Sequence, residues 1–410
     1  MDLLIVTFSS LRAHGLRFGL TSLGILWGSF MLTYLSASLE GLDRHFTHLL
    51  ETTGPKLVIA WPGAILKSRV GERGARQVEL DNDDVDRIAT ILQVELASQN
   101  AVLWAQVVRS GRRTKLLNVT GVSPQTSEIR NFAVAVGRFV SQTDVDRGAR
   151  VAFLGHTAAE RLFGFRSAVG ETLQIESIRF RVIGVAREKG EQLIGGLGRD
   201  DNAVLIPYST AQRLLQHGDG VAQVVFAPTT REESGGTTRR VREVLGLHHH
   251  FDPDVDSAIS FFNVHDVMQI IYSVFFGLRI FLVSAGVVTL LVGAVSVMNI
   301  MLVVVGERTS EIGLRKAVGG SRREIFVQFL AEATAVCGLS GVAGAAMGVG
   351  MIQLTARYTP EDGALTSMPI LDPFTVTVIV VSLVAVGIVA GVVPAVRAAR
   401  VEPAEALRSV

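Results

Sequence analysis

The chain has 410 residues, of which 48% are hydrophobic and 19% are charged, and its mean hydropathy is +0.39. Soluble domains carry about 25% charged residues, so the balance points toward a membrane protein. Yet 39 basic and 38 acidic residues are too many for a chain that lies wholly within a bilayer. The net charge of +1 comes without a long basic patch, and one cysteine excludes an internal disulfide and a Cys-rich metal site. Composition predicts membrane helices combined with one soluble domain.

The first residues predict a membrane helix that starts in the cytoplasm. We expect a cytoplasmic amphipathic segment at 1–17 and a first span at 18–39. This apolar run has the length of about 20 residues that crosses a bilayer. Arg12 and Arg17 precede it and acidic residues follow it, so the positive-inside rule places the N-terminus inside. A secretory signal peptide is the alternative, because the sequence from Leu35 (LSAS) resembles a cleavage site.

Residues 40–272 contain no apolar run long enough to span a membrane. Their composition is that of a globular domain large enough to form its own core. Both helical and alternating apolar spacings occur, which predicts a large mixed α/β extracytoplasmic domain between spans 1 and 2. The expected local elements are a helix capped by Asn82 or Asp83, a hairpin of strands 173–175 and 179–185, a strand at 204–207 and a helix capped by Ser209.

Two motifs in this domain suggest chemistry, but we expect neither to be a site. The histidines from His248 to His250 can bind a metal, yet no Asp, Glu or His stands at a helical ligand spacing. The glycine-rich stretch 195–198 (GGLG) can cradle a phosphate, yet no Lys-Ser or Lys-Thr pair follows it. We therefore expect loops at both places, and no metal site and no catalytic residue in the chain.

The second half of the chain predicts three more spans. An amphipathic stretch from Ser260 becomes uniformly apolar at Ile280, so we expect one long helix that is a stalk above and a span below. Arginines in the tail place the C-terminus inside, which gives an integral membrane α-helical protein with four transmembrane helices and both termini cytoplasmic. The expected segments are the stalk and span 273–305, a charged segment 306–324, the third span 325–356, an outer loop 357–372, the fourth span 373–394, which Pro394 ends, and a tail 395–410.

The third span combines small residues with one buried charge. Its glycines lie three and four residues apart on one face, which allows another helix to approach closely. The alternative is that glycine is simply common in membrane helices. Glu332 either marks a functional site or pairs with an arginine of the charged segment, and we favour the pairing. The glycines expected to pack against a helix are Gly338, Gly341, Gly344 and Gly348.

The charged segment 306–324 is expected to be a cytoplasmic helix that binds a soluble partner. Its charges are three to four residues apart, so a short helix presents them together. The interleaved apolar residues Ile312, Leu314 and Val318 are expected to anchor it in a groove on the partner. The alternative is that these charges only set the membrane topology. Topology alone, however, does not require acidic and apolar residues to be so closely interleaved. The residues expected to make the contact are Glu307, Arg308, Glu311, Ile312, Leu314, Arg315, Lys316 and Val318.

The sequence from Met298 to Gly320 (MNIMLVVVGERTSEIGLRKAVGG) closely resembles the signature of ABC-transporter permeases of the MacB/FtsX type. The resemblance covers nearly the whole chain, and its charged-segment and C-terminal motifs are the specific ones. The other segments that carry it are RFGLTSLGILWG at 17–28, GPKLV at 54–58, VAFLG at 151–155, LFG at 162–164, DNAVLIPYSTAQR at 201–213 and PAVRAARVEPAEALR at 394–408.

The resemblance implies a dimer of four-span subunits in a bacterial cytoplasmic membrane. It implies that a cytoplasmic ABC ATPase binds the segment 306–324 and carries ATP and Mg²⁺, and that its closure moves the stalk helices. Some members carry the ATPase in the same chain, but no G-x-x-x-x-G-K-[ST] occurs here, so we expect a separate ATPase and no cofactor on this chain. A periplasmic adaptor and membrane lipids are further expected partners.

Two other functions remain open on the sequence. The chain can be a regulator that transports nothing and activates an extracytoplasmic partner such as a cell-wall hydrolase. It can also be an independent membrane sensor, which would have no ATPase partner. Export or extraction of a substrate at the outer face is the leading hypothesis, and the substrate and the direction of movement stay undetermined.

Overall fold

A computed structural model gives the arrangement of the chain as two units. The sheet unit is Phe46–Ile271, and the helical unit is Met1–His45 with Tyr272–Val410. Nearly all of the predicted N-terminal segment and of the outer loop, the end of the tail and the glycine-rich stretch lie outside the described residues. The structure describes residues 15–66, 75–164, 166–190, 192, 199–216, 221–358 and 373–402.

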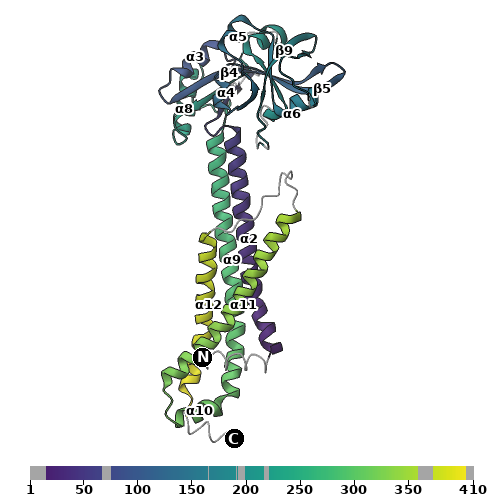
Figure 1. Cartoon of the computed structure of the whole chain (residues 1–410). Coiled ribbons are helices and arrows are strands. Elements are labelled where there is room, and N and C mark those ends of the chain that lie inside the picture. Colours follow the sequence, from purple (N-terminus) through teal and green to yellow (C-terminus); the bar gives the residue numbers. More distant parts are fainter. Residues whose placement is uncertain are drawn as a thin grey trace. The chain divides into compact units, whose positions relative to one another are not determined.

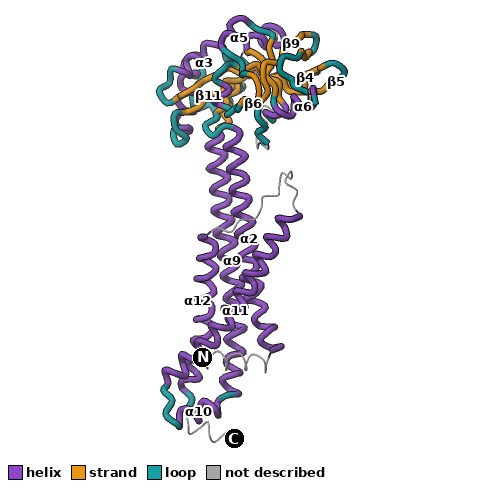
Figure 2. Tube along the Cα trace, in the orientation of Figure 1, coloured by secondary structure: helices purple, strands orange, loops and turns teal. Residues whose placement is uncertain are grey.

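The sheet unit is built on a mixed ten-stranded sheet, which Figure 2 shows in orange. Its strand order is β12-β1-β11-β4-β5-β10-β7-β9-β6, and β8 pairs with β4 and β9. The short strands β2 and β3 form a separate pair. The strands are β1 (Val58–Pro62), β2 (Ala64–Leu66), β3 (Ala75–Gln77), β4 (Val94–Ser110), β5 (Arg113–Val122), β6 (Val134–Gly137), β7 (Val151–Leu154), β8 (Thr172–Ile175), β9 (Ile178–Ala186), β10 (Ala203–Pro207), β11 (Gln223–Pro228) and β12 (Ile259–Asn263).

Side chains on the two faces of this sheet enter different apolar clusters. Along β1, Val58 and Ala60 join one cluster, while Ile59 joins the other together with Leu57, which precedes the strand, because successive side chains of a strand point to opposite faces. The first cluster is covered by α3, α6, α7 and α8, and the second by α4. The helices are α3 (Asn82–Ala89), α4 (Thr126–Ile129), α5 (Gln142–Arg147), α6 (His156–Phe163), α7 (Tyr208–Ala211) and α8 (Ser234–His249).

The predicted hairpin is confirmed. Strands β8 and β9 are antiparallel, with Ile175 opposite Ile178. Phe180 is buried and Arg179 is exposed, as the alternation of apolar and charged residues requires. The strand expected at 204–207 is β10. Alternation therefore predicted the hairpin and its buried face, whereas a continuous apolar run predicted β10, which is buried at every position.

Two predicted helix caps are wrong. Helix α3 is capped by Asp81 rather than by Asn82 or Asp83, because only the earlier residue is extended while its carboxylate reaches the first turn. Ser209 lies inside α7, and its hydroxyl donates a hydrogen bond to the carbonyl of Val145 instead of capping a helix. The helix expected from Ala211 is a π-helical segment, η2 (Gln212–Gln216).

The helical unit contains α10 (Thr309–Ala317) and most of four long helices (Figure 1). By length and composition, α9, α11 and α12 can cross a membrane. Among the described residues, α2, which covers the predicted first span, is not in that set. Length and composition therefore support three of the predicted spans, and they do not support the predicted total of four. The long helices are α2 (Gly15–Thr53), α9 (Val264–Glu307), α11 (Arg322–Tyr358) and α12 (Pro373–Arg400).

Helix α9 is continuous over 44 residues, as expected of a stalk that becomes a span. Its start was predicted too early, since Ser260 lies in β12 and pairs with Trp61 of β1. Pro394 does not end the last helix, because α12 continues through it to Arg400, while the predicted bounds of the span itself stay a prediction. The start of α9 is limited by the pairing of Ser260 with β1, which is distant in sequence. Helical periodicity cannot show such a pairing.

Within the helical unit, α2 and α9 run side by side, and glycines let them approach closely. A Cβ on Gly24 would lie 3.2 Å from the Cα of Gly293, and a Cβ on Gly286 would lie 2.4 Å from the side chain of Leu32. Nearby, Arg279 of α9 donates a hydrogen bond to Glu40 of α2 at 2.5 Å. Small residues and one ion pair therefore hold these helices together.

Candidate functional site

Helix α10, between α9 and α11, holds most of the residues that the sequence singles out. The turn at Arg308 ends α9, and α10 then runs for nine residues. Positions 308, 312 and 316 are four residues apart and share one face, whereas 311, 314, 315 and 318 share another. The two faces have different surroundings.

The first face is fixed to the helical unit. Ile312 is 3% exposed and belongs to the apolar cluster formed by α9, α11 and α12. Arg308 forms an ion pair with Glu332 of α11, with 3.6 Å between Nη1 and Oε2. Glu332 also accepts a hydrogen bond from Gln328 at 3.3 Å. This arrangement agrees with the predicted pairing of Glu332 with an arginine of the charged segment.

Lys316 completes this face by binding the end of α12. Its Nζ donates hydrogen bonds to the carbonyl oxygens of Ala399 at 2.5 Å and Val401 at 2.8 Å. Carbonyls in the last turn of a helix have no intrahelical donor, so a lysine there satisfies them. Burial lowers the pKa of Lys316, and Arg322 lowers it further, whereas Glu402 acts in the opposite direction.

The second face is exposed. Leu314 is 57% exposed and Val318 is 83% exposed, and the exposed residues Glu311 and Arg315 lie beside them. Arg315 donates a hydrogen bond to Gln328 at 2.9 Å. Apolar and charged side chains thus alternate on one solvent-facing strip, which we call the α10 face (Glu311, Leu314, Arg315 and Val318).

The structure divides the eight predicted contact residues into two groups. Glu307 and the four residues of the α10 face are exposed. Arg308, Ile312 and Lys316 are turned toward the helical unit, so the expectation that Ile312 anchors a partner is wrong. Sequence reasoning missed Gln328, which contacts both Arg315 and Glu332. Its position one helical turn before Glu332 was the available signal, whereas Arg315 lies 13 residues earlier on α10, at no helical spacing from Gln328.

The predicted packing glycines of α11 differ in what surrounds them. A Cβ on Gly344 would lie 2.1 Å from the carbonyl oxygen of Leu26, and one on Gly348 would lie 2.8 Å from Thr33, so both face α2. Gly341 faces Leu383 of α12. Among the described residues, a Cβ on Gly338 would meet no atom within 4 Å, so its packing against a helix stays a prediction.

Two family models match the chain. The MacB-like periplasmic core domain matches residues 18–243, which is more than half of the chain, and the FtsX-like permease C-terminal domain matches residues 283–403. The second match contains the α10 face, Glu332 and the glycines of α11.

Curated relatives extend over almost the whole chain. The macrolide export ATP-binding/permease protein MacB of Bdellovibrio bacteriovorus is 31% identical over 403 residues, and the match covers 98% of this chain and 60% of that protein. The protein of the same name from Hyphomonas neptunium is 31% identical over 411 residues, with the same coverage of each chain. The chain therefore spans about 60% of the length of these relatives.

A solved structure of the periplasmic region of MacB from Actinobacillus actinomycetemcomitans aligns with 54% of this chain and 95% of its own length, at 18% identity and a TM-score of 0.43. The two family models together account for residues 18–243 and 283–403. On these matches, the chain belongs to the MacB/FtsX family of ABC transporter permeases.

Proposed function

We propose that the chain is a permease subunit that converts ATP hydrolysis by a separate cytoplasmic ATPase into movement of the sheet unit outside the membrane. The movement serves the export or extraction of a substrate at the outer face. Membership of the ABC permease family supports this function. The relatives are named ATP-binding/permease proteins, and about 60% of their length is matched here, which is consistent with an ATPase outside these 410 residues.

In this proposal the chain crosses a bacterial cytoplasmic membrane four times, with both termini inside. Helix α2 is the first span, and α9, α11 and α12 are the others. Arg308, Arg315 and Arg322 mark one end of the helical unit as cytoplasmic. The sheet unit lies outside, because an odd number of spans separates it from that end.

The observation that carries the proposal is the division of α10 into a fixed face and an exposed face. If the segment only marked the membrane topology, the exposed Leu314 and Val318 would have no role beside the charged residues of the α10 face. Burial of apolar surface is favourable, so their exposure indicates a surface that a partner covers. An ATPase that covers the α10 face would desolvate Leu314 and Val318 and pair with the flanking charges. Arg308, Ile312 and Lys316 fix α10 to the other helices of the helical unit. Displacement of α10 would therefore be passed to α9, α11 and α12.

The same proposal assigns no reaction chemistry to the chain. The 410 residues contain no Walker A motif, so ATP and Mg²⁺ belong to the ATPase. We propose that two permease subunits associate, since an ATPase pair closes symmetrically and presents two docking sites. An adaptor protein at the sheet unit would indicate export, whereas a bound cell-wall hydrolase would indicate regulation of that enzyme.

A double charge reversal on the α10 face tests the coupling. The variant Glu311→Lys/Arg315→Glu keeps the net charge and the four-residue spacing of opposite charges but inverts the pattern offered to a partner. We expect stimulation of the ATPase by the reconstituted permease to fall at least about tenfold, since inverted charge pairs at an interface are repulsive. The measurement is the rate of ATP hydrolysis by the ATPase in membranes with and without the permease.

The control is Arg323→Glu, which changes an exposed charge on the first turn of α11 and leaves the α10 face intact. Melting curves of both variants should match that of the unchanged chain. Unaltered stimulation with the double variant would overturn the assignment of the α10 face as the ATPase contact.

A further inference from the structure

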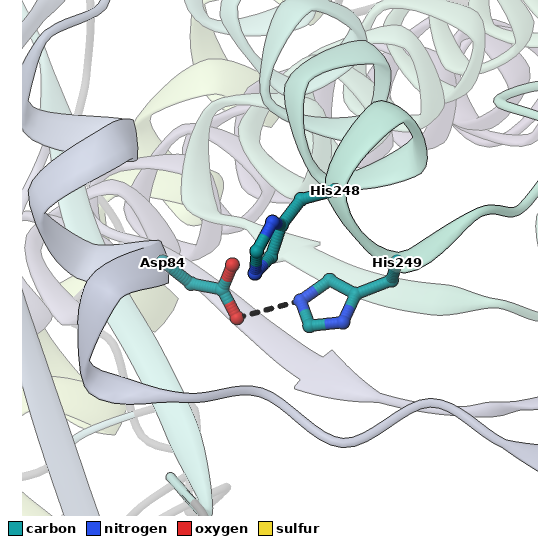
Figure 3. Close-up of side chains that lie close together, drawn as sticks. All are labelled: Asp84, His248 and His249. Atoms are coloured by element: carbon teal, nitrogen blue, oxygen red, sulfur yellow. Dashed lines mark hydrogen bonds and ion pairs between the residues drawn. The ribbon is translucent and has the colours of Figure 1, made fainter.

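We propose that Asp84, His248 and His249 bind a divalent transition-metal ion, of the zinc class, in the sheet unit. One ligand atom from each residue can be chosen so that all three lie within 4.8 Å of one another. Figure 3 shows both imidazole rings turned toward the carboxylate, which comes from a different helix. The site goes beyond the proposed transport function and replaces the expectation of no metal site.

The structure explains why the sequence predicts a loop here rather than a metal site. The histidines were expected in a solvated loop, but they form the last turn of α8. His249 is 15% exposed at its side chain and His248 is 34% exposed. Their partner stands 165 residues earlier in the chain, on α3. A ligand at such a sequence distance has no signature in spacing.

The contacts place the donor atoms of the cluster together. His249 Nε2 lies 2.7 Å from Asp84 Oδ2. His248 Nε2 lies 3.4 Å from Asp81 Oδ2, so a second carboxylate stands at the edge of the cluster. Ligand atoms of tetrahedral zinc are roughly 3.4 Å apart, given bonds of about 2.1 Å. Small side-chain rotations therefore suffice to bring these atoms around one ion.

Asp84 is the strongest indication that this cluster binds a cation. Its side chain is completely buried, and Oδ1 has no hydrogen-bond partner among the described residues. The guanidinium of Arg87 lies 3.9 Å away, measured from its Nη1 to that oxygen. A buried carboxylate oxygen without a donor is costly. A metal ion bound by Oδ1 and the two imidazoles would satisfy it.

Both helices hold the ligands in place by backbone contacts. Asp81 and Asp84 form a capping box at the start of α3, each accepting a hydrogen bond from the backbone N–H of the other. At the end of α8, Arg76 donates a hydrogen bond to the carbonyl oxygen of His249 at 2.7 Å. The C-terminal end of a helix also favours a cation. The site is therefore organised before metal arrives.

The ligand set indicates which metal fits. Two imidazoles with one or two carboxylates suit zinc and related ions, whereas magnesium and calcium prefer oxygen ligands alone. Asp81 or a water molecule would complete the coordination. The bound ion would tie α3 to the end of α8 and stabilise the sheet unit, since ligands that bind only the folded state raise its stability.

The test uses the full chain in detergent, without a histidine tag, stripped with EDTA and dialysed. Calorimetric titration with ZnSO₄ should give one saturable equivalent per chain and a raised melting temperature, whereas MgCl₂ should give neither. Bound Co²⁺ should show the intense visible absorption of tetrahedral nitrogen and oxygen coordination. His248→Gln and His249→Gln should each weaken zinc binding by at least ~10-fold, because each removes a direct ligand.

The matched control is His250→Gln, since His250 is the exposed third histidine of the run and lies outside the cluster. It should bind zinc as the unchanged chain does. Equal loss in all three variants would show that an exposed histidine run binds the ion, which overturns the site. Absence of a saturable equivalent, or of the tetrahedral Co²⁺ spectrum, in the unchanged chain would overturn it as well.

Discussion

At the scale of single residues, Asp144 organises the start of α5. Its carboxylate accepts a hydrogen bond from the backbone N–H of Ser141 at 2.9 Å and from Arg138 Nη1 at 2.5 Å. The hydrogen bond from Arg138 lowers the pKa of Asp144 to about 2, although burial acts to raise it. The ionised carboxylate is thus stabilised in the folded state.

Replacement of Asp144 is expected to remove a pH-dependent part of the stability. The folded-state pKa lies below the ordinary 3.8, so the contribution is present above pH 3.8 and is lost as the pH falls toward 2. Because Arg138 is half exposed, we expect Asp144→Asn to cost about 1 kcal/mol at neutral pH, or about 2–4 °C in melting temperature. Melting curves of the full chain from pH 7 to pH 2.5 should show the difference shrinking.

The neighbouring exposed carboxylate offers the control for this experiment. Asp146 lies two residues on and accepts a hydrogen bond from Gln142. Asp146→Asn should leave the melting temperature within about 1 °C at every pH, because exposed pairs contribute little. A difference between Asp144→Asn and the unchanged chain that stays constant over the whole pH range would contradict the role given to Arg138.

At the scale of helices, glycine decides how closely α11 approaches α2. A methyl group on Gly344 would overlap the backbone carbonyl of Leu26, which cannot move without its helix. We expect Gly344→Ala to separate the two helices and to lower the melting temperature of the purified chain by several degrees, since overpacking costs about 1–3 kcal/mol. Thermal unfolding in detergent measures this change.

Gly338 is the matched control on the same helix. Among the described residues nothing lies within 4 Å of a Cβ placed there, and alanine favours helix by about 1 kcal/mol over glycine. Gly338→Ala should therefore be neutral or slightly stabilising. Equal destabilisation by both substitutions would show that glycine acts through helix flexibility in α11 and not through contact with α2.

The sequence predicted elements whose pattern is local and missed contacts that join distant segments. The hairpin of β8 and β9 follows from alternation, and the long helix α9 follows from its apolar run. The apolar spacing at Ser260 predicts a helix where the structure has a strand, because pairing with β1 leaves no trace in periodicity. The motif of α10 located the candidate site, but only tertiary contacts separate buried Ile312 from exposed Leu314.

At the scale of the molecule, the proposed function depends on one covalent feature. Helix α9 begins at Val264 in the sheet unit and ends at Glu307, next to α10. A continuous helix keeps its backbone hydrogen bonds along its whole length, so it transmits displacement without an intervening loop. Proline within it removes a hydrogen bond and bends it, at a cost of about 3 kcal/mol.

Gly277→Pro is expected to interrupt this transmission, because Gly277 is an exposed position within α9 where no described atom would contact a Cβ. On a Cys337→Ala background, a spin label at Leu92→Cys, a position 91% exposed in the sheet unit, reports the distance between two subunits. With the ATPase present, ATP should shift this distance in the unchanged helix and in Gly277→Ala, but not in Gly277→Pro. Basal ATP hydrolysis should remain in all three. A full ATP-dependent shift in the proline variant would show that α9 does not carry the movement.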